Sequence, residues 1–399
     1  MNNFFRSQSP PFNAESITDT IERALSSAGL DTKSGPMQGV TETIRRALSS
    51  SGMSGVPHRP GGDESVIDVV ARVVGEPHDR KPESIPRPPP SAPGLPGKFA
   101  AGDFSNAAGT RAYKVYVPAR ASEGPMPLIV MLHGCTQSAD DFAAGTQMNR
   151  LAEEHGFLVV YPEQPTSANM SKCWNWFKKE DQRRDSGEPS LIAGIVGEVA
   201  RTHPVDRRRV FVAGLSAGAA MAVILGEAYP ELFAGVGAHS GLPFASAHDI
   251  PSAMAAMKGG RSGMADLTGL TSAGPAVRRK TTQATPTIVF HGDRDHTVQQ
   301  SNGTAIAQQA SEAYVAATDG KSALESTTQR GTASGGRSYS RTIMTDLTGQ
   351  PQLETWTLHG AGHAWSGGNA AGSYTDGKGP DASAEMVRFF LAQRRAGTA

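Results

Sequence analysis

A serine between two glycines is the first residue in this 399-residue chain whose setting suggests chemistry. Ser216 lies in Gly214-Leu-Ser-Ala-Gly218, after the apolar run 210–213 and before the Ala-, Met- and Leu-rich run 219–229. The first run predicts a buried strand and the second a helix. The pattern Gly-x-Ser-x-Gly by itself would fit an ordinary turn, but between a strand and a helix it predicts a nucleophile elbow. We therefore expect Ser216 to be an exposed nucleophile.

A serine nucleophile needs a base, and the base needs an orienting acid. Two later runs that predict strands, 287–290 and 354–358, are each followed by polar candidates. The first leads into His291-Gly-Asp-Arg-Asp295 and the second into His359-Gly-Ala-Gly-His363. Serine, aspartate and histidine in that order, each after a strand, match one known arrangement of a Ser-His-Asp triad.

Within these two loops, His363 is our predicted base, because the preceding glycines leave it exposed on a flexible segment. His359 is interpreted as the residue that closes the strand. Asp295 is our predicted acid, because it lies further round the turn than Asp293, which is interpreted as a turn residue beside Gly292. The other histidines near this rim are interpreted as solvated loop residues or neighbours of the site: His239, His291 and His296.

An acyl-transfer site also needs backbone donors for the developing oxyanion. The N–H of Ala217 opens the predicted helix after the elbow and is one candidate. The second is expected from the loop Leu132-His-Gly-Cys-Thr-Gln137, which follows the apolar run 128–132. Cys135 N–H is the predicted donor there.

Two cysteines and three tryptophans lie in segments expected near the same rim. Cys173 begins Cys173-Trp-Asn-Trp-Phe177, and a bond to Cys135 would fix the oxyanion loop; two free buried thiols are the alternative. Two cysteines are too few for a structural zinc site, and no metal or cofactor is expected. Three aromatic side chains are predicted to offer apolar surface to substrate, with simple packing as the alternative: Trp174, Trp176 and Trp365.

Strands that alternate with helices predict an α/β fold with a doubly wound, mostly parallel sheet. The expected strands are 111–117 (an edge strand), 128–132, 157–161, 210–213, 234–238, 287–290 and 354–358. The expected helices are 140–155, 191–202 and 381–393. The Gly-, Ala- and Met-rich stretch 244–285 is interpreted as a lid or a surface insertion.

The first 98 residues differ from the rest. Ile17 to Gly29 is echoed by Val40 to Gly52, and both copies have apolar residues at helical spacing. We predict an extension of short amphipathic helices over 1–75, a Pro-rich linker over 76–98 and a catalytic domain over 99–399. The extension is interpreted as flexible, with docking on a partner or a polymer surface as the sharper hypothesis.

Composition excludes several classes of partner. Lys plus Arg and Asp plus Glu both number 38, so neither nucleic acid nor an anionic membrane is indicated. No apolar run reaches the 18 or so residues of a membrane span. The N-terminus shows no apolar stretch typical of a secretory signal.

Together these segments resemble the esterase family of extracellular-type short-chain polyhydroxyalkanoate (polyhydroxybutyrate) depolymerases, over about 111–392. The resemblance rests on His133-Gly-Cys-Thr-Gln137, Cys173-Trp-Asn-Trp-Phe177, Gly214-Leu-Ser-Ala-Gly218, His291-Gly-x-x-Asp295-x-x-Val298, Gly362-His-Ala-Trp-Ser-Gly-Gly368, Gly372-Ser-Tyr-Thr-Asp376 and Gly379-Pro-Asp-Ala-Ser383. It implies an α/β-hydrolase fold, a triad of Ser216, Asp295 and His363, oxyanion donors at Cys135 and Ala217, and no metal.

The resemblance also implies a function. We expect a serine esterase that cleaves a short-chain polyhydroxyalkanoate polyester or oligomer through an acyl-enzyme. A feruloyl or acetyl esterase acting on plant polysaccharide is the alternative within the family. A granule- or partner-binding protein acting through the N-terminal helices is the alternative from another class. The resemblance implies an extracellular site of action, and because we see no secretory signal the cytoplasm is the alternative. The chain also lacks a Cys- or Thr-rich substrate-binding domain after the core, which argues against attack on crystalline polymer.

Overall fold

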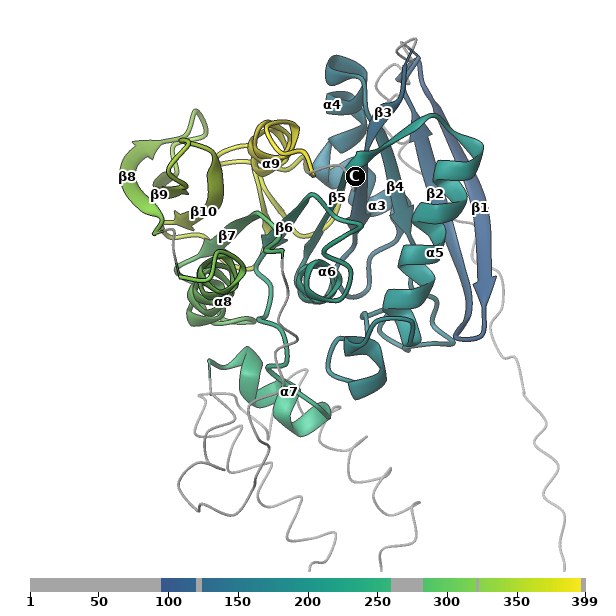
Figure 1. Ribbon diagram of the computed structural model, residues 1–399, viewed down its shortest axis with the longest axis horizontal. Coiled ribbons are helices and arrows are strands. Elements are labelled where there is room, and N and C mark those ends of the chain that lie inside the picture. Colours follow the sequence, from purple (N-terminus) through teal and green to yellow (C-terminus); the bar gives the residue numbers. More distant parts are fainter. Residues whose placement is uncertain (1–94, 120–123, 260–282, 321–322, 396–399) are drawn as a thin grey trace, which may run out of the picture. The chain divides into compact units, whose positions relative to one another are not determined.

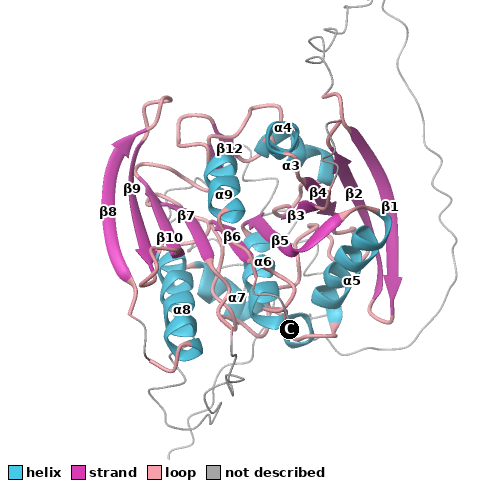
Figure 2. Cartoon of the chain, turned by 45° about the horizontal axis from the view of Figure 1, so that its top comes forward, coloured by secondary structure: helices cyan, strands magenta, loops and turns pink. Residues whose placement is uncertain are grey.

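A computed structural model of the chain describes residues 95–119, 124–259, 283–320 and 323–395. The predicted extension 1–75 lies outside the described residues, as do most of the predicted linker 76–98 and residues 260–282 of the predicted insertion. In the described part, one ten-stranded sheet has the order β1-β2-β4-β3-β5-β6-β7-β10-β9-β8, and helices cover both of its faces (Figures 1 and 2). A separate two-stranded sheet pairs β11 with β12.

The strands are β1 (Lys98–Asn106), β2 (Gly109–Val117), β3 (Met126–Leu132), β4 (Leu158–Pro162), β5 (Val205–Leu215), β6 (Gly235–His239), β7 (Thr287–Gly292), β8 (Glu325–Thr332), β9 (Ser338–Thr345), β10 (Pro351–Leu358), β11 (Trp365–Ser366) and β12 (Thr375–Asp376). The helices are α3 (Ala139–Thr146), α4 (Met148–His155), the 3₁₀ helix η1 (Lys179–Gln182), α5 (Gly187–Thr202), α6 (Ala217–Ala228), α7 (Ile250–Met257), α8 (Ser301–Ala317) and α9 (Ala382–Leu391).

The central strands divide their side chains between two hydrophobic cores. In β3 every residue is buried, which explains its unbroken apolar sequence. Leu128, Val130 and Leu132 join a core that also contains residues of α5, α6 and α8. Ile129 and Met131 point to the opposite face, where they join residues of α3, α4 and α9. The period of two along the strand therefore builds both layers of the doubly wound fold.

The parallel centre of the sheet confirms the predicted α/β architecture. Strands β4, β3, β5, β6, β7 and β10 run parallel to one another. The predicted helices 191–202 and 381–393 correspond to α5 and α9. The predicted helix 140–155 is instead two helices, because Gln147 takes a left-handed conformation (φ 56°) between α3 and α4.

The flanks of the sheet differ from the prediction. The strand expected at an edge, β2, lies inside it, because β1 pairs antiparallel with its outer side. At the other edge β9 and β8 add antiparallel to β10. The flanking strands β1, β8 and β9 contain no fully buried residue, so they lack the continuous apolar run by which the central strands were predicted.

Register across the sheet brings the carboxyl ends of the parallel strands to one edge. Leu215 at the end of β5 pairs with His239 at the end of β6, and His239 pairs with Phe290 near the end of β7. Phe290 in turn pairs with Trp356 in β10. The loops that follow β5, β7 and β10 therefore leave the sheet side by side, where α/β folds carry their sites. Among the described helices, none has the length and apolar character needed to cross a bilayer.

Candidate active site

Ser216 lies on a strained turn between β5 and α6. Its backbone has φ 57° and ψ −121°, a conformation that L-residues rarely adopt outside special turns. Its N–H donates to the carbonyl of His239 at 2.9 Å, which ties the turn to the neighbouring strand. A side chain on Gly214 would collide with the backbone of Gly218, and one on Gly218 would collide with the carbonyl of Leu132. The glycines are thus required by close backbone approach on both sides of the serine.

Asp295 and His363 are hydrogen-bonded to each other. Asp295 Oδ2 is 2.7 Å from His363 Nδ1. The other carboxylate oxygen accepts the N–H groups of Thr297 (3.0 Å) and Val298 (2.9 Å). The Asp295 side chain is fully buried and that of His363 is 12% exposed. Burial opposes ionisation of Asp295, but the hydrogen bond and charge interaction with His363, aided by Val298 N–H, leave its pKa lowered.

This geometry leaves the far nitrogen of the His363 ring for another partner. With Nδ1 bound to the carboxylate, Nε2 makes no hydrogen bond to any described residue. Ser216 Oγ likewise has no such bond within the described part of the chain. A hydroxyl near Nε2 can pass its proton to the ring while the buried carboxylate stabilises the imidazolium.

His239 joins the elbow to the loop that carries His363. Its carbonyl accepts Ser216 N–H, and its Nε2 accepts Ser366 N–H at 3.0 Å. Its ring stacks between Phe290 and Trp365. Burial, followed by the charges of His291 and His363, lowers the pKa of His239 to about 3, so this ring stays a neutral acceptor.

The three histidines interpreted as solvated loop residues differ in burial. His239 and His291 are buried, which corrects that interpretation for both, whereas His296 is exposed. His291 Nε2 lies 2.8 Å from the carbonyl of Val298, and burial lowers its pKa. Apolar strands that end in His-Ser (239–240) and His-Gly (291–292) are the sequence signal that would have indicated burial.

The predicted oxyanion loop lies beside the elbow, because Leu132 at the end of β3 pairs with Gly214. Gly134 N–H donates to Gln137 Oε1 at 2.9 Å, which closes the loop on itself. His133 is buried, and its carbonyl accepts Trp174 Nε1–H at 3.1 Å. Neither Cys135 N–H nor Ala217 N–H, the two predicted donors, is engaged by a described residue.

The two cysteines form a disulfide, so the free-thiol alternative is excluded. Cys135 and Cys173 are 38 residues apart in sequence. The bond attaches the oxyanion loop to the loop that contains Trp174 and Asn175. Asn175 is itself fixed by Glu188, a buried carboxylate that accepts its backbone N–H at 2.8 Å and its side-chain amide at 2.7 Å. The oxyanion loop is therefore fixed from outside as well as from within.

The three tryptophans do not present surface to a substrate, and the expectation that they do is wrong. Trp174, Trp176 and Trp365 are all buried. Trp174 donates to His133, and Trp365 donates from Nε1 to Ser383 Oγ at 3.0 Å. A large ring beside a partner for its N–H is better satisfied in the core than in solvent. The packing alternative holds for all three.

A second Asp–His pair, which the sequence did not indicate, lies in the same two loops. Asp293 Oδ2 is 3.0 Å from His359 Nδ1, and Asp293 Oδ1 accepts Gly360 N–H at 2.6 Å. Asp293 is thus more than a turn residue. His359 Nε2 lies 2.9 Å from Ser340 Oγ on β9, a strand that the sequence did not indicate.

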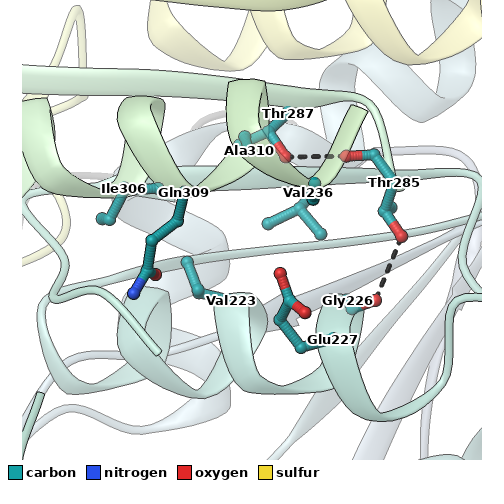
Figure 3. Close-up of a pocket in the computed structure, with 10 residues that line it drawn as sticks. Val223, Gly226, Glu227, Val236, Thr285, Thr287, Ile306, Gln309 and Ala310 are labelled. Carbon is teal, nitrogen blue, oxygen red and sulfur yellow. Dashed lines mark hydrogen bonds between the residues drawn. The ribbon is translucent and has the colours of Figure 1, made fainter. Parts of the chain in front are cut away.

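A small pocket between α6 and α8 is separate from these residues. It is lined by side chains that include Val223, Val236, Ile306 and Gln309 (Figure 3). Its volume of about 30 Å³ matches a water molecule rather than a substrate. Among the described residues, no group of three or more His, Cys, Asp or Glu side chains is placed to hold a metal ion.

Comparison with known proteins places the geometry in a family. The family model described as Esterase PHB depolymerase matches residues 111–330, more than half of the chain. Poly(3-hydroxyalkanoate) depolymerase C of Paucimonas lemoignei is 31% identical over 246 residues, which cover 59% of this chain and 54% of that protein. Acetylxylan esterase A of Aspergillus oryzae is 36% identical over 143 residues, covering 35% of this chain and 45% of that protein.

A solved structure has a similar fold. An acetyl xylan esterase from Aspergillus awamori superposes with a TM-score of 0.53 at 20% identity, covering 73% of this chain and 99% of that chain. The chain spans about half the length of the curated relatives it matches. The sheet order, the elbow and the sequence match agree with one another: the chain has an α/β-hydrolase fold and belongs to the PHB depolymerase esterase family.

Proposed function

We propose that the chain is a carboxylic-ester hydrolase that works through a covalent acyl-enzyme on Ser216. The observation that carries this proposal is the 2.7 Å hydrogen bond between the buried Asp295 carboxylate and His363, on loops beside the strained Ser216 turn. Family membership supports it, since the relatives named above are a depolymerase of poly(3-hydroxyalkanoate) and an acetylxylan esterase.

The reaction would proceed in two halves. In the first, Ser216 Oγ attacks the ester carbonyl carbon and His363 Nε2 takes the hydroxyl proton. His363 then returns that proton to the departing alkoxide, so the alcohol leaves and the acyl group remains on Ser216. In the second half, His363 takes a proton from water, the resulting hydroxide attacks the acyl carbon, and the carboxylic acid leaves as Ser216 regains its proton.

Asp295 would hold the His363 ring in the tautomer that carries its proton on Nδ1. Because its carboxylate is buried and accepts two backbone N–H groups, it is fixed before the substrate arrives. The oxyanion formed in each half would accept the N–H groups of Cys135 and Ala217. Each such donor contributes on the order of 3 kcal/mol to the transition state.

For the substrate we propose a short-chain polyhydroxyalkanoate, in particular a polyhydroxybutyrate polyester or oligomer. The family match and the Paucimonas lemoignei relative support this choice. An acetyl ester of plant polysaccharide is the second candidate, favoured equally by the acetylxylan esterase relatives; feruloyl esters remain the third.

The test measures hydrolysis of p-nitrophenyl butyrate, amorphous polyhydroxybutyrate, acetylated xylan and a feruloyl ester by the wild type and by Ser216→Ala. We expect the wild type to cleave the butyrate ester and the polyester, and the variant to cleave neither. If the wild type cleaved acetylated xylan or the feruloyl ester but not the polyester, the proposed mechanism would stand and the proposed substrate would be wrong. Full activity in Ser216→Ala would refute the mechanism.

We also propose the domain division 1–75, 76–98 and 99–399, with the duplicated N-terminal segments acting as a docking extension for a polymer surface. The duplication supports this division, as does the start of β1 at Lys98. Limited proteolysis of the full chain is expected to cut first within 76–98 and to leave p-nitrophenyl butyrate hydrolysis intact while reducing sedimentation with polymer granules. Early cuts inside 99–395, or granule binding unaffected by the cut, would contradict it.

A further inference from the structure

Two residues with unfavourable backbone conformations meet beside the oxyanion loop. Thr136 follows Cys135 and has φ 68°, and Tyr374 has φ 52°. Their side-chain hydroxyl oxygens are 3.3 Å apart. β-Branched and bulky residues rarely adopt a positive φ, and such conformations persist only where the surroundings enforce them. Strain of this kind clusters at binding and catalytic sites, as it does here at Ser216.

A network of hydrogen bonds around Asp141 constrains the backbone next to Tyr374. The residue before it, Ser373, donates its backbone N–H to Asp141 at 2.9 Å and its hydroxyl to the same carboxylate at 2.6 Å. Gln137 donates to Asp141 at 2.7 Å and to the Ser373 carbonyl at 3.2 Å. Gln137 is also the acceptor for Gly134 N–H, so one side chain fixes both the oxyanion loop and the Tyr374 turn.

The Tyr374 turn is also tied to the loop of His363. The carbonyl of Tyr374 accepts Trp365 N–H at 2.7 Å, and Trp365 follows His363 by two residues. The next residue, Thr375, pairs with Trp365 in the parallel β11–β12 sheet. Tyr374 is therefore positioned from two directions, by the loop of the proposed oxyanion donor and by the loop of the proposed base.

Despite these constraints the side chain of Tyr374 points outward. It is 47% exposed, whereas Trp174, Trp176 and Trp365 are all buried. The backbone N–H of Thr136 donates to Ser171 O at 2.7 Å. The residue before Ser171 is Met170, whose side chain is 92% exposed. Thr136 is thus hydrogen-bonded to two segments that each carry an exposed side chain with a large apolar surface.

We propose that Tyr374 contacts the hydrocarbon chain of an aliphatic ester beyond the scissile bond, and so sets the preference for longer substrates. This inference rests on the proposed function, because it places the scissile ester at Ser216. The ring is the group that binds, while the bond from its hydroxyl to Thr136 fixes the ring beside the oxyanion loop.

The first measurement is binding in a background that cannot turn over. The 3-hydroxybutyrate trimer is titrated by calorimetry into full-length Ser216→Ala and into the same chain with Tyr374→Ala, Tyr374→Phe or Leu347→Ala added. Leu347 is a matched control, because it is 71% exposed in the turn between β9 and β10. We expect Tyr374→Ala to weaken binding about tenfold, Tyr374→Phe less than about threefold, and Leu347→Ala to have no effect.

Binding that is equal in the Ser216→Ala background and in Tyr374→Ala, or no trimer binding at all, would overturn the inference. A Tyr374→Phe variant as weak as Tyr374→Ala would overturn the role of the ring. Circular dichroism and thermal unfolding of each variant separate a loss of contact from a loss of fold. Alanine, like tyrosine, carries a Cβ atom, so the variant meets the same backbone strain at this positive φ and the backbone is expected to keep its conformation.

The second measurement is hydrolysis with Ser216 present. The ratio of kcat/KM for p-nitrophenyl octanoate over p-nitrophenyl acetate is expected to fall about tenfold in Tyr374→Ala, through KM on the longer ester. An equal loss on both esters would overturn the inference, since it would mean that the residue positions the machinery for every substrate. Lack of any hydrolysis by the wild type would refute the proposed function while the binding result still decides the role of Tyr374.

Discussion

Two Asp–His pairs lie on the same two loops of this protein, each beside a serine from another element, and the two pairs differ in burial. Asp295 pairs with His363 at 2.7 Å, and Asp293 pairs with His359 at 3.0 Å. The side chains of the first pair are 0% and 12% exposed, those of the second 37% and 42%. In the second set Ser340 Oγ already contacts the histidine at 2.9 Å.

Residue identity and hydrogen bonding alone would favour the second set as the catalytic triad. The structural positions of the two serines favour the first set instead. Ser340 lies within the antiparallel strand β9, whereas Ser216 lies on a strained turn whose next residue opens α6. A helix N-terminus and an adjacent fixed loop supply donors for an oxyanion, and a buried carboxylate acts on its histidine with little screening by water. What separates a proposed catalytic triad from a surface hydrogen-bond chain here is the position in the sheet.

Replacing each of the two serines in turn should give the largest difference between the two sets. We expect Ser216→Ala to lower kcat on p-nitrophenyl butyrate by about 10⁶-fold, since the serine, the base and the acid act as one unit. Ser340→Ala, the matched control, is expected to stay within about twofold of the wild type. A large loss in Ser340→Ala with a small one in Ser216→Ala would exchange the two assignments.

Replacing the two acids gives the next largest effect. Asp295→Asn removes the charge that holds the tautomer of His363, and turnover should fall by about 10⁴-fold. Asp293→Asn changes an exposed pair and should cost less than about threefold. The measurement is kcat for p-nitrophenyl butyrate with both variants at matched pH. Similar losses in the two variants would mean that burial does not decide between the pairs.

The disulfide also distinguishes the two sets, because it fixes the loop beside Ser216 and no loop beside Ser340. The double variant Cys135→Ala/Cys173→Ala opens a connection between residues 38 apart. By loop entropy the free energy of unfolding should fall by up to about 4 kcal/mol, measured by urea denaturation. We expect kcat to fall about tenfold, less than the about 10²- to 10³-fold lost with a whole oxyanion donor, because Trp174 still holds His133. Unchanged stability and kcat would contradict this role of the bond.

The smallest expected effect is the pH dependence of stability that comes from His239, the buried residue whose carbonyl accepts Ser216 N–H. His239 is neutral in the folded chain, since its pKa is lowered to about 3, but takes up a proton near pH 6.5 when unfolded. The folded state should therefore lose about 1.4 kcal/mol per pH unit from this residue as pH falls below about 6.5.

His239→Gln keeps an acceptor for Ser366 N–H and removes the titrating group. Urea unfolding at pH 7, 6 and 5 should show a shallower loss of stability in the variant than in the wild type. Equal slopes would mean that His239 is protonated in the fold, and so less enclosed than the structure indicates.

How far each element was predictable depended on its pattern. The strand β3 was visible because all seven of its residues are buried and apolar, and the elbow was visible because two glycines and a serine stand between a strand and a helix. The strands β8 and β9 were not visible, because most of their residues are polar and their place at the edge of the sheet is set by the pairing of β9 with β10 and of β8 with β9. The break at Gln147 was hidden because its left-handed conformation interrupts a helical sequence pattern that carries no glycine or proline at that position.

The sequence alone indicated the order of the central strands β2 to β7 and β10 and of the helices α5, α6 and α9. It also indicated one candidate set of serine, aspartate and histidine, and the pairing partners available to two cysteines. Those features depend on local patterns and on the identity of reactive side chains. Only the tertiary structure decided that Trp174, Trp176 and Trp365 are buried, that Asp293 and His359 form a separate exposed pair, and that Tyr374 stands beside the oxyanion loop. Burial and proximity arise from contacts between distant segments, so no local pattern contains them.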